Sequence, residues 1–337
     1  MWKFSTGVPR GTPKRALNYQ KFHYFPVHGL PRRAALNSGI ALLLAVGYSS
    51  PADDSLQKIM ARVIAVTNQK GGVGKTTTAI NLAASFAAAE VETLLVDCDP
   101  QSNASSGVGF ARDPERLSTY HLLTGLAPAE DVVQAGPLEQ LWVIPSSKNL
   151  IGANIELVPV DRREFRLRDA IECVRDRFQF IVLDCPPALD LLTLNALVAA
   201  DSVLIPMQAE YFALEGVSEL LDTIERIRQN FNPTLGIEGV ILTMFDDRTN
   251  LAQQVSANLR EYFGDRLCST SVPRNVRLAE APSHGKPALL YDPRSRGAEA
   301  YIRLAKEIME RASAPLAPDQ IGNHPMNGIG VSAESND

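Results

Sequence analysis

The stretch VTNQKGGVGKTTTAINLAA, residues 66–84, constrains the fold of this 337-residue chain more than any other part of it. The apolar run RVIAVT leads into it, and a helical pattern follows from about Lys75. The glycines at 71, 72 and 74 permit backbone angles that turn successive N–H groups inward, and the helix start adds partial positive charge. A strand, a glycine-rich loop and a helix in this order predict a phosphate-binding loop. A glycine-rich turn without a ligand is the alternative.

The loop departs from the usual pattern G-x-x-x-x-G-K-[ST] in two respects. Counting back from Gly74, Lys75 and Thr76, the first glycine should stand at position 69, where the chain has Gln69. A second lysine, Lys70, follows directly. Lys75 is placed to meet terminal phosphates, and the Thr76 hydroxyl is placed for Mg²⁺. The usual pattern therefore leaves Lys70 without a role.

Short apolar runs alternate with helical patterns through most of the remaining chain. Continuous runs rich in Val, Ile and Leu are typical of strands buried on both faces of a parallel sheet. The alternation predicts one α/β domain with a doubly wound, mostly parallel sheet flanked by helices. We expect strands at 62–67, 93–97, 141–145, 180–184, 202–206, 237–243 and 269–273, and helices that include 76–89, 163–178 and 216–231.

Three acidic residues stand at the ends of predicted strands. LLVDCDPQ puts Asp97 and Asp99 after the second strand, and FIVLDCPP ends on Asp184. Ligands of open α/β sheets lie at the carboxyl ends of the strands, so these carboxylates are expected beside the loop. Asp184 has the position of a Walker B acid. Any one of the three could instead cap a helix.

These motifs resemble those of a known family. KGGVGKTTTAINLA is similar to the deviant Walker A motif, and LLVDCDPQSNASSG to the Walker A′ segment, of ParA-type partition ATPases. The resemblance continues through FIVLDCPPALDLLTLNAL, IEGVILTMFDDRTN and VPRNVRLAEAPSHGKPALLYDPRSRGAEAYIRLAKEI. It covers about residues 61–310 and is nearest to the chromosomal ParA/Soj subgroup.

The resemblance implies an ATP-dependent sandwich dimer and a role for each lysine. Lys70 would reach the partner's phosphates, which stabilises developing charge only once the dimer has formed. Lys75 would bind phosphate within its own subunit, and Thr76 with Asp184 would serve Mg²⁺. Asp99 would orient the attacking water, so Lys70 and Asp99 are the catalytic residues expected. The expected ATP site comprises Lys70, Gly71, Gly72, Val73, Gly74, Lys75, Thr76, Thr77, Pro273 and Asn275.

The same resemblance implies a DNA-partitioning switch. Family members hydrolyse ATP slowly, bind DNA without sequence preference as ATP dimers, and are released by a ParB-type centromere-binding protein that stimulates hydrolysis. We therefore expect a cytoplasmic, nucleoid-associated protein that drives chromosome segregation. The net charge of −5 gives no support for DNA binding, so a local basic patch is required. Its candidates are Arg226, Arg228, Arg248, Arg274 and Arg277, with Arg294 and Arg296 as further possibilities; ordinary surface pairing is the alternative for each.

Other proteins with this loop fit less well. A MinD-like spatial regulator ends in a basic amphipathic membrane helix, which the tail APDQIGNHPMNGIGVSAESND lacks. No membrane partner is expected, although MinD or another deviant Walker A ATPase acting on a protein stays the alternative. The four scattered cysteines match neither an iron–sulfur motif nor a disulfide framework.

Both ends of the chain differ from the core. Residues 1–60 hold eight Lys and Arg against two Asp, and their apolar run GIALLLAVGY is too short to span a bilayer. We interpret 1–59 as a disordered arm or a mis-assigned start before Met60. The ATPase domain is expected over 60–312. The segment 313–337, rich in Pro, Gly, Asn and Ser, is expected to be a disordered tail.

Overall fold

The computed structural model describes residues 61–210 and 213–312, so the expectations for 1–59 and 313–337 lie outside the described residues. Within this part of the chain the strands form one eight-stranded sheet in the order β3-β4-β2-β5-β1-β6-β7-β8. Every pair is parallel except β3 with β4. The predicted doubly wound, mostly parallel sheet is confirmed. The strands are β1 (Arg62–Val66), β2 (Thr93–Asp97), β3 (Gln134–Ala135), β4 (Leu141–Ile144), β5 (Phe180–Asp184), β6 (Ser202–Gln208), β7 (Gly236–Phe245) and β8 (Leu267–Pro273).

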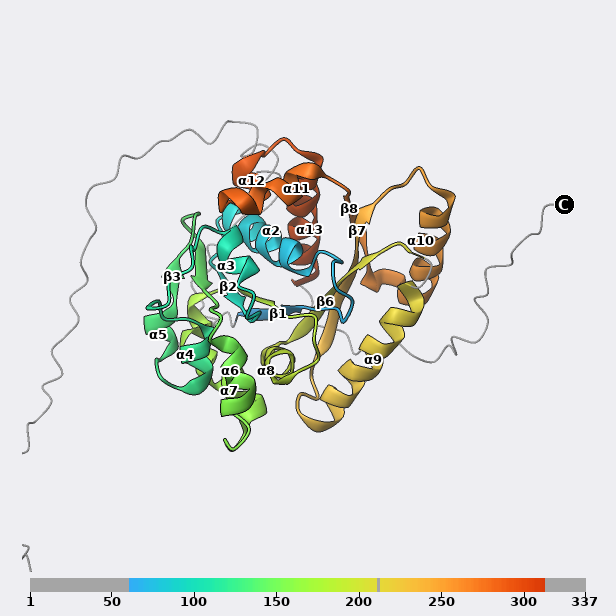
Figure 1. Cartoon of the computed structure of the whole chain (residues 1–337). Coiled ribbons are helices and arrows are strands. Elements are labelled where there is room, and N and C mark those ends of the chain that lie inside the picture. The colour runs from blue at the N-terminus through green and yellow to red at the C-terminus, as the bar shows by residue number, and fades with distance from the viewer. Residues whose placement is uncertain (1–60, 211–212, 313–337) are drawn as a thin grey trace, which may run out of the picture. The chain divides into compact units, whose positions relative to one another are not determined.

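Helices cover both faces of this sheet (Figure 1). One face carries α2 (Lys75–Ala88), α3 (Asn103–Gly107), α11 (Val276–Glu280), η4 (Ala281–His284), α12 (Ala288–Tyr291) and α13 (Arg296–Ala312). The other face carries α4 (Thr119–Thr124), α5 (Ala129–Val132), α6 (Leu150–Glu156), η1 (Arg163–Phe165), α7 (Arg166–Ile171), η2 (Glu172–Arg177), α8 (Leu191–Ala199), α9 (Ala213–Asn230) and α10 (Asn250–Phe263). A 3₁₀ turn, η3 (Gly264–Arg266), links α10 to β8.

Strand β1 shows why the apolar runs are continuous. Val63 and Ala65 belong to the core on one face of the sheet, while Ile64 and Val66 belong to the core on the other. Because successive side chains of a strand point to opposite faces, a strand covered by helices on both sides needs apolar residues at every position. The run that predicted this strand therefore reflects its central place in the sheet.

One predicted helix is wrong in its extent. The segment 163–178 contains a six-residue α-helix, α7, between two 3₁₀ segments, η1 and η2. The side chain of Asn195 on α8 interrupts it, because its Oδ1 accepts from Leu167 N (3.0 Å) and its Nδ2 donates to Arg163 O (2.9 Å). Such side-chain bonds compete with the α-helical pattern. The other two predicted helices are confirmed as α2 and α9.

The strand order creates the crevice in which a ligand of such a sheet binds. Strand β1 lies between β5 and β6, whereas the next strand in sequence, β2, lies beyond β5. The connections that leave the carboxyl ends of β1 and β6 thus diverge to opposite sides, which opens a crevice there. In the pairing register, Val66, Asp184 and Asp97 stand side by side at this end of β1, β5 and β2. The glycine loop and all three acids therefore meet at one edge.

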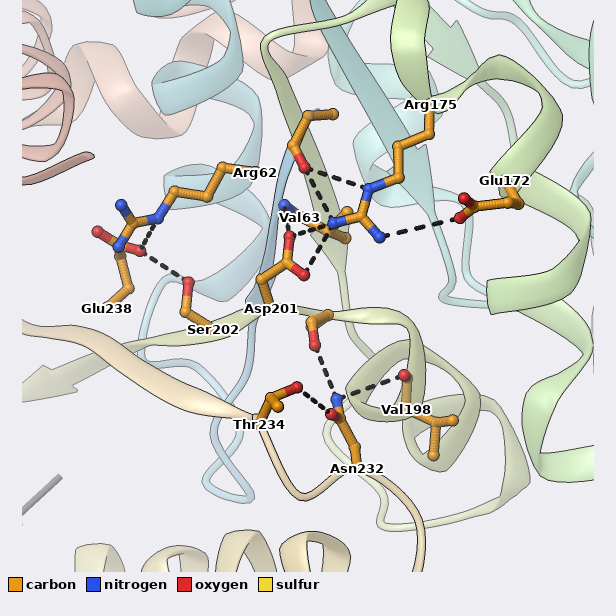
Figure 2. Close-up of polar contacts among 12 residues, drawn as sticks. Arg62, Val63, Glu172, Arg175, Val198, Asp201, Ser202, Asn232, Thr234 and Glu238 are labelled. Carbon is orange, nitrogen blue, oxygen red and sulfur yellow. Dashed lines mark hydrogen bonds and ion pairs between the residues drawn. The ribbon is translucent and has the colours of Figure 1, made fainter. Parts of the chain in front are cut away.

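A polar network fastens the opposite, amino-terminal edge (Figure 2). The Arg175 guanidinium donates to Ala61 O through Nε (3.2 Å) and Nη2 (3.1 Å), and Nη2 also binds Asp201 Oδ2 (2.6 Å). Val63 N in turn donates to Asp201 Oδ2 at 2.8 Å. Beside them, the buried Glu238 accepts from Arg62 Nε at 2.8 Å. This network holds the beginning of β1.

Candidate nucleotide site

The glycine loop has the backbone shape that an anion site requires. Gly72 and Gly74 have φ angles of 76° and 87°, in the left-handed region that favours glycine. Gly74 is the N-cap of α2 and, as a glycine, makes no side-chain cap bond to the first turn of that helix. No acidic residue occupies this first turn either. The N–H groups and the positive end of α2 are therefore available to a phosphate.

The two lysines of the loop stand in different environments. Lys75 is 7% exposed, and its Nζ donates to the Lys70 carbonyl at 2.9 Å. Burial lowers the pKa of Lys75, and the nearby Asp184 opposes this shift. The Lys70 side chain is 50% exposed and pairs with Glu210, just beyond the end of β6. Lys75 is thus part of the inner loop, whereas Lys70 stands at its surface.

Neighbouring strands and a helix support the loop from outside. Thr243 on β7 donates through Oγ1 to Val73 O (2.8 Å) and Met207 O (3.1 Å). Gln69, which replaces the first glycine of the usual pattern, donates through Nε2 to Thr223 Oγ1 on α9 at 3.1 Å. The side chain at position 69 therefore connects the loop to α9, the helix that follows β6.

Asp97 has a structural role in the turn after β2. It is fully buried; its Oδ2 accepts from Ser105 N (2.8 Å) and Ser105 Oγ (2.6 Å), and its Oδ1 accepts from Asp99 N (3.0 Å). Burial, together with the charge of Asp99, raises the pKa of Asp97 to about 6 despite these donors. Asp97 thus shapes the turn that carries Asp99 and ties it to α3, although the N-cap of that helix is Ser102 and not Asp97.

Asp99 faces the crevice from this turn. It is 7% exposed, its Oδ1 accepts from Gln101 N at 2.9 Å, and its charge acts on both Lys75 and Asp184. Its carbonyl accepts from Ser146 Oγ at 2.7 Å, so the loop after β4 also fixes it. The structure brings Asp99 close to the loop, as predicted.

Asp184 is the residue whose environment most needs a ligand. It is fully buried, and neither of its carboxylate oxygens has a hydrogen-bond partner among the described residues. Burial and the charge of Asp97 raise its pKa, while Lys75 and the Thr76 hydroxyl, which is near but outside hydrogen-bonding geometry, partly oppose the shift. A buried, unpartnered carboxylate beside a threonine hydroxyl is a donor set that suits Mg²⁺, a cation that prefers oxygen ligands. The residues present therefore fit the predicted metal.

A cavity of about 430 Å³ adjoins the loop on its other side. Gly74 and Thr77 line it together with Pro273 and Asn275. Asn275 Oδ1 also accepts from Arg277 N (2.8 Å) as the N-cap of α11, which fixes the wall in place. The two predicted segments, about 200 positions apart in the chain, thus enclose one space next to the glycine loop.

The candidate arginines divide into two regions. Arg248 is 84% exposed and chelates Asp246, whose pKa is lowered to about 2 by Arg248 and, more weakly, by Arg274. Arg277 lies on α11 and pairs with Glu280 (Nη1 to Oε2, 2.8 Å). Arg248, Arg274 and Arg277 therefore belong to the carboxyl edge around β7 and β8.

The other two arginines lie on α9. Arg226 lines a surface groove of about 630 Å³ together with residues of α6 and α8. Arg228 donates through Nε to Leu235 O at 2.6 Å and has an ion pair with Glu225, so it anchors the end of its own helix. The predicted basic set is therefore not one patch within a single subunit.

Sequence reasoning missed several residues that build the site. Glu210, the partner of Lys70, lies in the run MQAEYF, where only its position after a predicted strand could have indicated it. Ser105 and Ser146 support the Asp99 turn from two different loops. Thr243 supports the glycine loop from β7. No local pattern marks these residues, because each acts through a contact far away in the chain.

The chain is similar to known proteins over most of its length. A family model described as an AAA domain matches residues 61–237. The chromosome partitioning protein ParA of Myxococcus xanthus is 52% identical over 259 residues, covering 77% of this chain and 91% of that protein. The sporulation initiation inhibitor protein Soj of Bacillus subtilis is 54% identical over 249 residues, covering 74% of this chain and 98% of that protein.

Solved structures show the same fold. The cobyrinic acid a,c-diamide synthase of Mycobacterium smegmatis, with bound ADP and magnesium, superposes with a TM-score of 0.65 at 32% identity. The match covers 76% of this chain and 96% of that one. In the part of the chain that the structure describes, no helix has the length and apolar character needed to cross a bilayer.

Proposed function

This chain belongs to the ParA/Soj family of chromosome-partitioning ATPases, and we propose that it is an ATP-driven switch that moves DNA. In this proposal two subunits enclose two ATP molecules, bind DNA without sequence preference, and separate after hydrolysis. One observation carries the proposal: Lys75 is buried in the inner loop, whereas Lys70 is half-exposed at its surface. A second lysine held at the surface of the loop is in a position to reach a nucleotide on another subunit.

The inner loop supplies the binding of ATP within one subunit. Lys75 and the N–H groups at the start of α2 hold the phosphates, and the cavity bounded by Thr77, Pro273 and Asn275 accepts adenine. Thr76 and Asp184 hold Mg²⁺, which neutralises phosphate charge when it is bound. The unpartnered oxygens of Asp184 support this assignment.

Hydrolysis depends on Lys70 and Asp99. Lys70 leaves Glu210 and places its charge on the partner's phosphates, which stabilises the transition state only in the closed dimer. Asp99, held by Gln101 N and by the turn that Asp97 shapes, orients the attacking water. A carboxylate near the γ-phosphate repels it, so its presence there favours a role in positioning water.

DNA binding is assigned to the arginines of the carboxyl edge. Arg248, Arg274 and Arg277 are exposed on one subunit, and dimerisation doubles their number. Their contacts go to phosphate, so affinity is expected to fall steeply with salt. A ParB-type protein, as in the family, is the proposed stimulator of hydrolysis, and the proposed location is the nucleoid.

The test uses Asp99→Ala, with the exposed Asp131→Ala on α5 as a matched control. Asp99→Ala is expected to bind ATP, accumulate as the closed dimer in size-exclusion chromatography, and stay on DNA after a ParB-type partner is added. Asp131→Ala is expected to cycle like the wild type. An Asp99→Ala protein that binds ATP but stays monomeric contradicts the assignment. Retention by anionic lipid vesicles in place of DNA indicates the MinD-like alternative.

A further inference from the structure

A second cavity, of about 270 Å³, lies beyond the carboxyl ends of β2 and β4. Its walls come from the turn after Asp99, from residues 110–116 and from the loop 146–149. Three cationic side chains line it, those of Arg112, Arg116 and Lys148, against one anionic side chain, Asp113. It shares no lining residue with the cavity beside the glycine loop. The lining is therefore net positive on a chain whose net charge is −5.

Arg116 is held in place before any ligand arrives. Its Nη1 donates to Ala111 O at 2.7 Å, its Nη2 lies 3.8 Å from Asp113 Oδ2, and its guanidinium covers the Phe110 ring at 5.2 Å. These contacts leave other N–H groups of the Arg116 guanidinium available to donate hydrogen bonds. A planar guanidinium fixed in this way loses little conformational entropy when it binds an oxyanion.

Arg112 and Lys148 supply charge that the protein itself does not neutralise. Both residues are exposed at the cavity, and within residues 61–210 and 213–312 no hydrogen bond or ion pair engages either side chain. Serine hydroxyls at 102 and 147 add neutral hydrogen-bonding groups to the same lining. Cations around a concave, hydroxyl-lined space are the arrangement that a multiply charged oxyanion requires.

We propose that this cavity binds a phosphate group, carried by a small molecule or by a nucleic-acid strand. A phosphate presents three acceptor oxygens, enough for the Arg116 guanidinium and for the two exposed cations, Arg112 and Lys148, at once. The size of the cavity suits one such group with part of its carrier.

The position of the cavity connects it to the hydrolytic turn. Ser146, on its wall, donates through Oγ to Asp99 O (2.7 Å), and Ser105, also on its wall, donates through Oγ to Asp97 Oδ2 (2.6 Å). A ligand that shifts this wall changes the placement of the Asp99 carboxylate. This regulatory consequence rests on the proposed function, whereas phosphate binding itself does not.

The experiment measures pyrophosphate binding to the full chain by calorimetry, with the glycine loop already saturated by ADP and Mg²⁺. Wild type is compared with the double variant Arg112→Gln/Lys148→Gln. The control double variant Arg260→Gln/Lys306→Gln removes the same charge from exposed sites on α10 and α13. We expect one further site in the wild type and the control, and a loss of affinity of at least about tenfold in the cavity variant. Thermal unfolding verifies that all three proteins fold.

A parallel arm replaces pyrophosphate with a short DNA duplex. If duplex binding alone falls in the cavity variant and not in the control, the bound phosphate belongs to nucleic acid. If neither probe distinguishes the cavity variant from the control, the proposal is overturned. The rate of ATP hydrolysis, measured at constant free Mg²⁺ with and without the phosphate ligand, tests separately whether the cavity affects Asp99. If the ligand binds and the rate does not change, the regulatory consequence is wrong, whereas the binding site stands.

Discussion

Asp97 and Asp184 are register partners on adjacent parallel strands, and each is the last residue of its strand. Both are fully buried, yet Asp97 accepts three hydrogen bonds, whereas Asp184 accepts none from the described residues. When two carboxyl groups lie this close together and both are buried, the charge of one disfavours ionisation of the other. The pair therefore divides into an acid held by three hydrogen bonds and an acid without such a partner among the described residues.

The first prediction concerns pH. Asp97 has a pKa of about 6 in the folded protein, above the value of about 4 in an unfolded chain. Its contribution to stability is therefore fully present below pH 4 and is lost as the pH rises through 6. The loss is on the order of 3 kcal/mol. Urea unfolding without Mg²⁺ should show the free-energy difference between wild type and Asp97→Asn moving in favour of wild type between pH 7 and pH 4. A difference that is constant with pH contradicts the raised pKa.

Asp184→Asn should separate stability from function. Removing a buried, unpartnered charge is expected to raise the Tm of the Mg²⁺-free protein at pH 8 by about 2–4 °C, equivalent to about 1 kcal/mol. The same change should abolish the strengthening of ATP binding by Mg²⁺, because the proposed ligand is lost. Calorimetric ATP titrations with and without Mg²⁺ measure this second effect. Asp131→Asn is the control, and a lowered Tm in Asp184→Asn would mean that the carboxylate has a stabilising partner.

The two lysines should fail in different ways. Lys75→Ala is expected to abolish ATP binding, whereas Lys70→Ala should bind ATP as a monomer and form no hydrolytically competent dimer. Glu210→Gln removes the exposed partner of Lys70 and should change stability by less than about 1 kcal/mol. Equilibrium ATP binding and light scattering make the comparison, with Lys306→Ala as control. Equal loss of ATP binding in both lysine variants contradicts the division of roles.

A protein that starts at Met60 should fold and bind ATP like the full chain. The beginning of β1 is already fastened from within residues 61–312, because Ala61 and Val63 bind Arg175 and Asp201 (Figure 2). Melting temperature and ATP affinity of 60–337 are therefore expected to equal those of the full-length protein. A Tm lower by several degrees would show that residues 1–59 stabilise the domain.

Arg175→Ala should destabilise the protein, because it leaves Ala61 O and the Asp201 carboxylate without this donor. The expected loss is about 2–3 kcal/mol in urea unfolding, the usual effect for hydrogen bonds to a charged group in a partly buried site. Arg168→Ala is the matched control, since Arg168 is 39% exposed, pairs with the neighbouring acid Asp169 and covers the Phe165 ring at 4.5 Å, contacts that lie outside the β1 network. Equal stability of the two variants would show that the amino-terminal network does not hold β1.

The sequence by itself determined the sheet and the loop. A strand covered on both faces must be apolar at every position, so β1, β2 and β5 are visible as runs of Val, Ile and Leu. Gly72 and Gly74 are visible because the backbone angles they adopt favour glycine. These features depend on residues that are adjacent in the chain, so a local sequence pattern is enough to indicate them.

Only the tertiary structure decided where each acid and each lysine lies and which residues it contacts. Asp97 and Asp99 are the same residue type and only two positions apart. In the structure, however, Ser105 donates to the Asp97 carboxylate, whereas the Asp99 side chain faces the crevice. Lys70 is set apart from Lys75 by its pairing with Glu210, 140 positions away. Such differences arise from the strand order and from contacts between distant segments, whose energies no local pattern records.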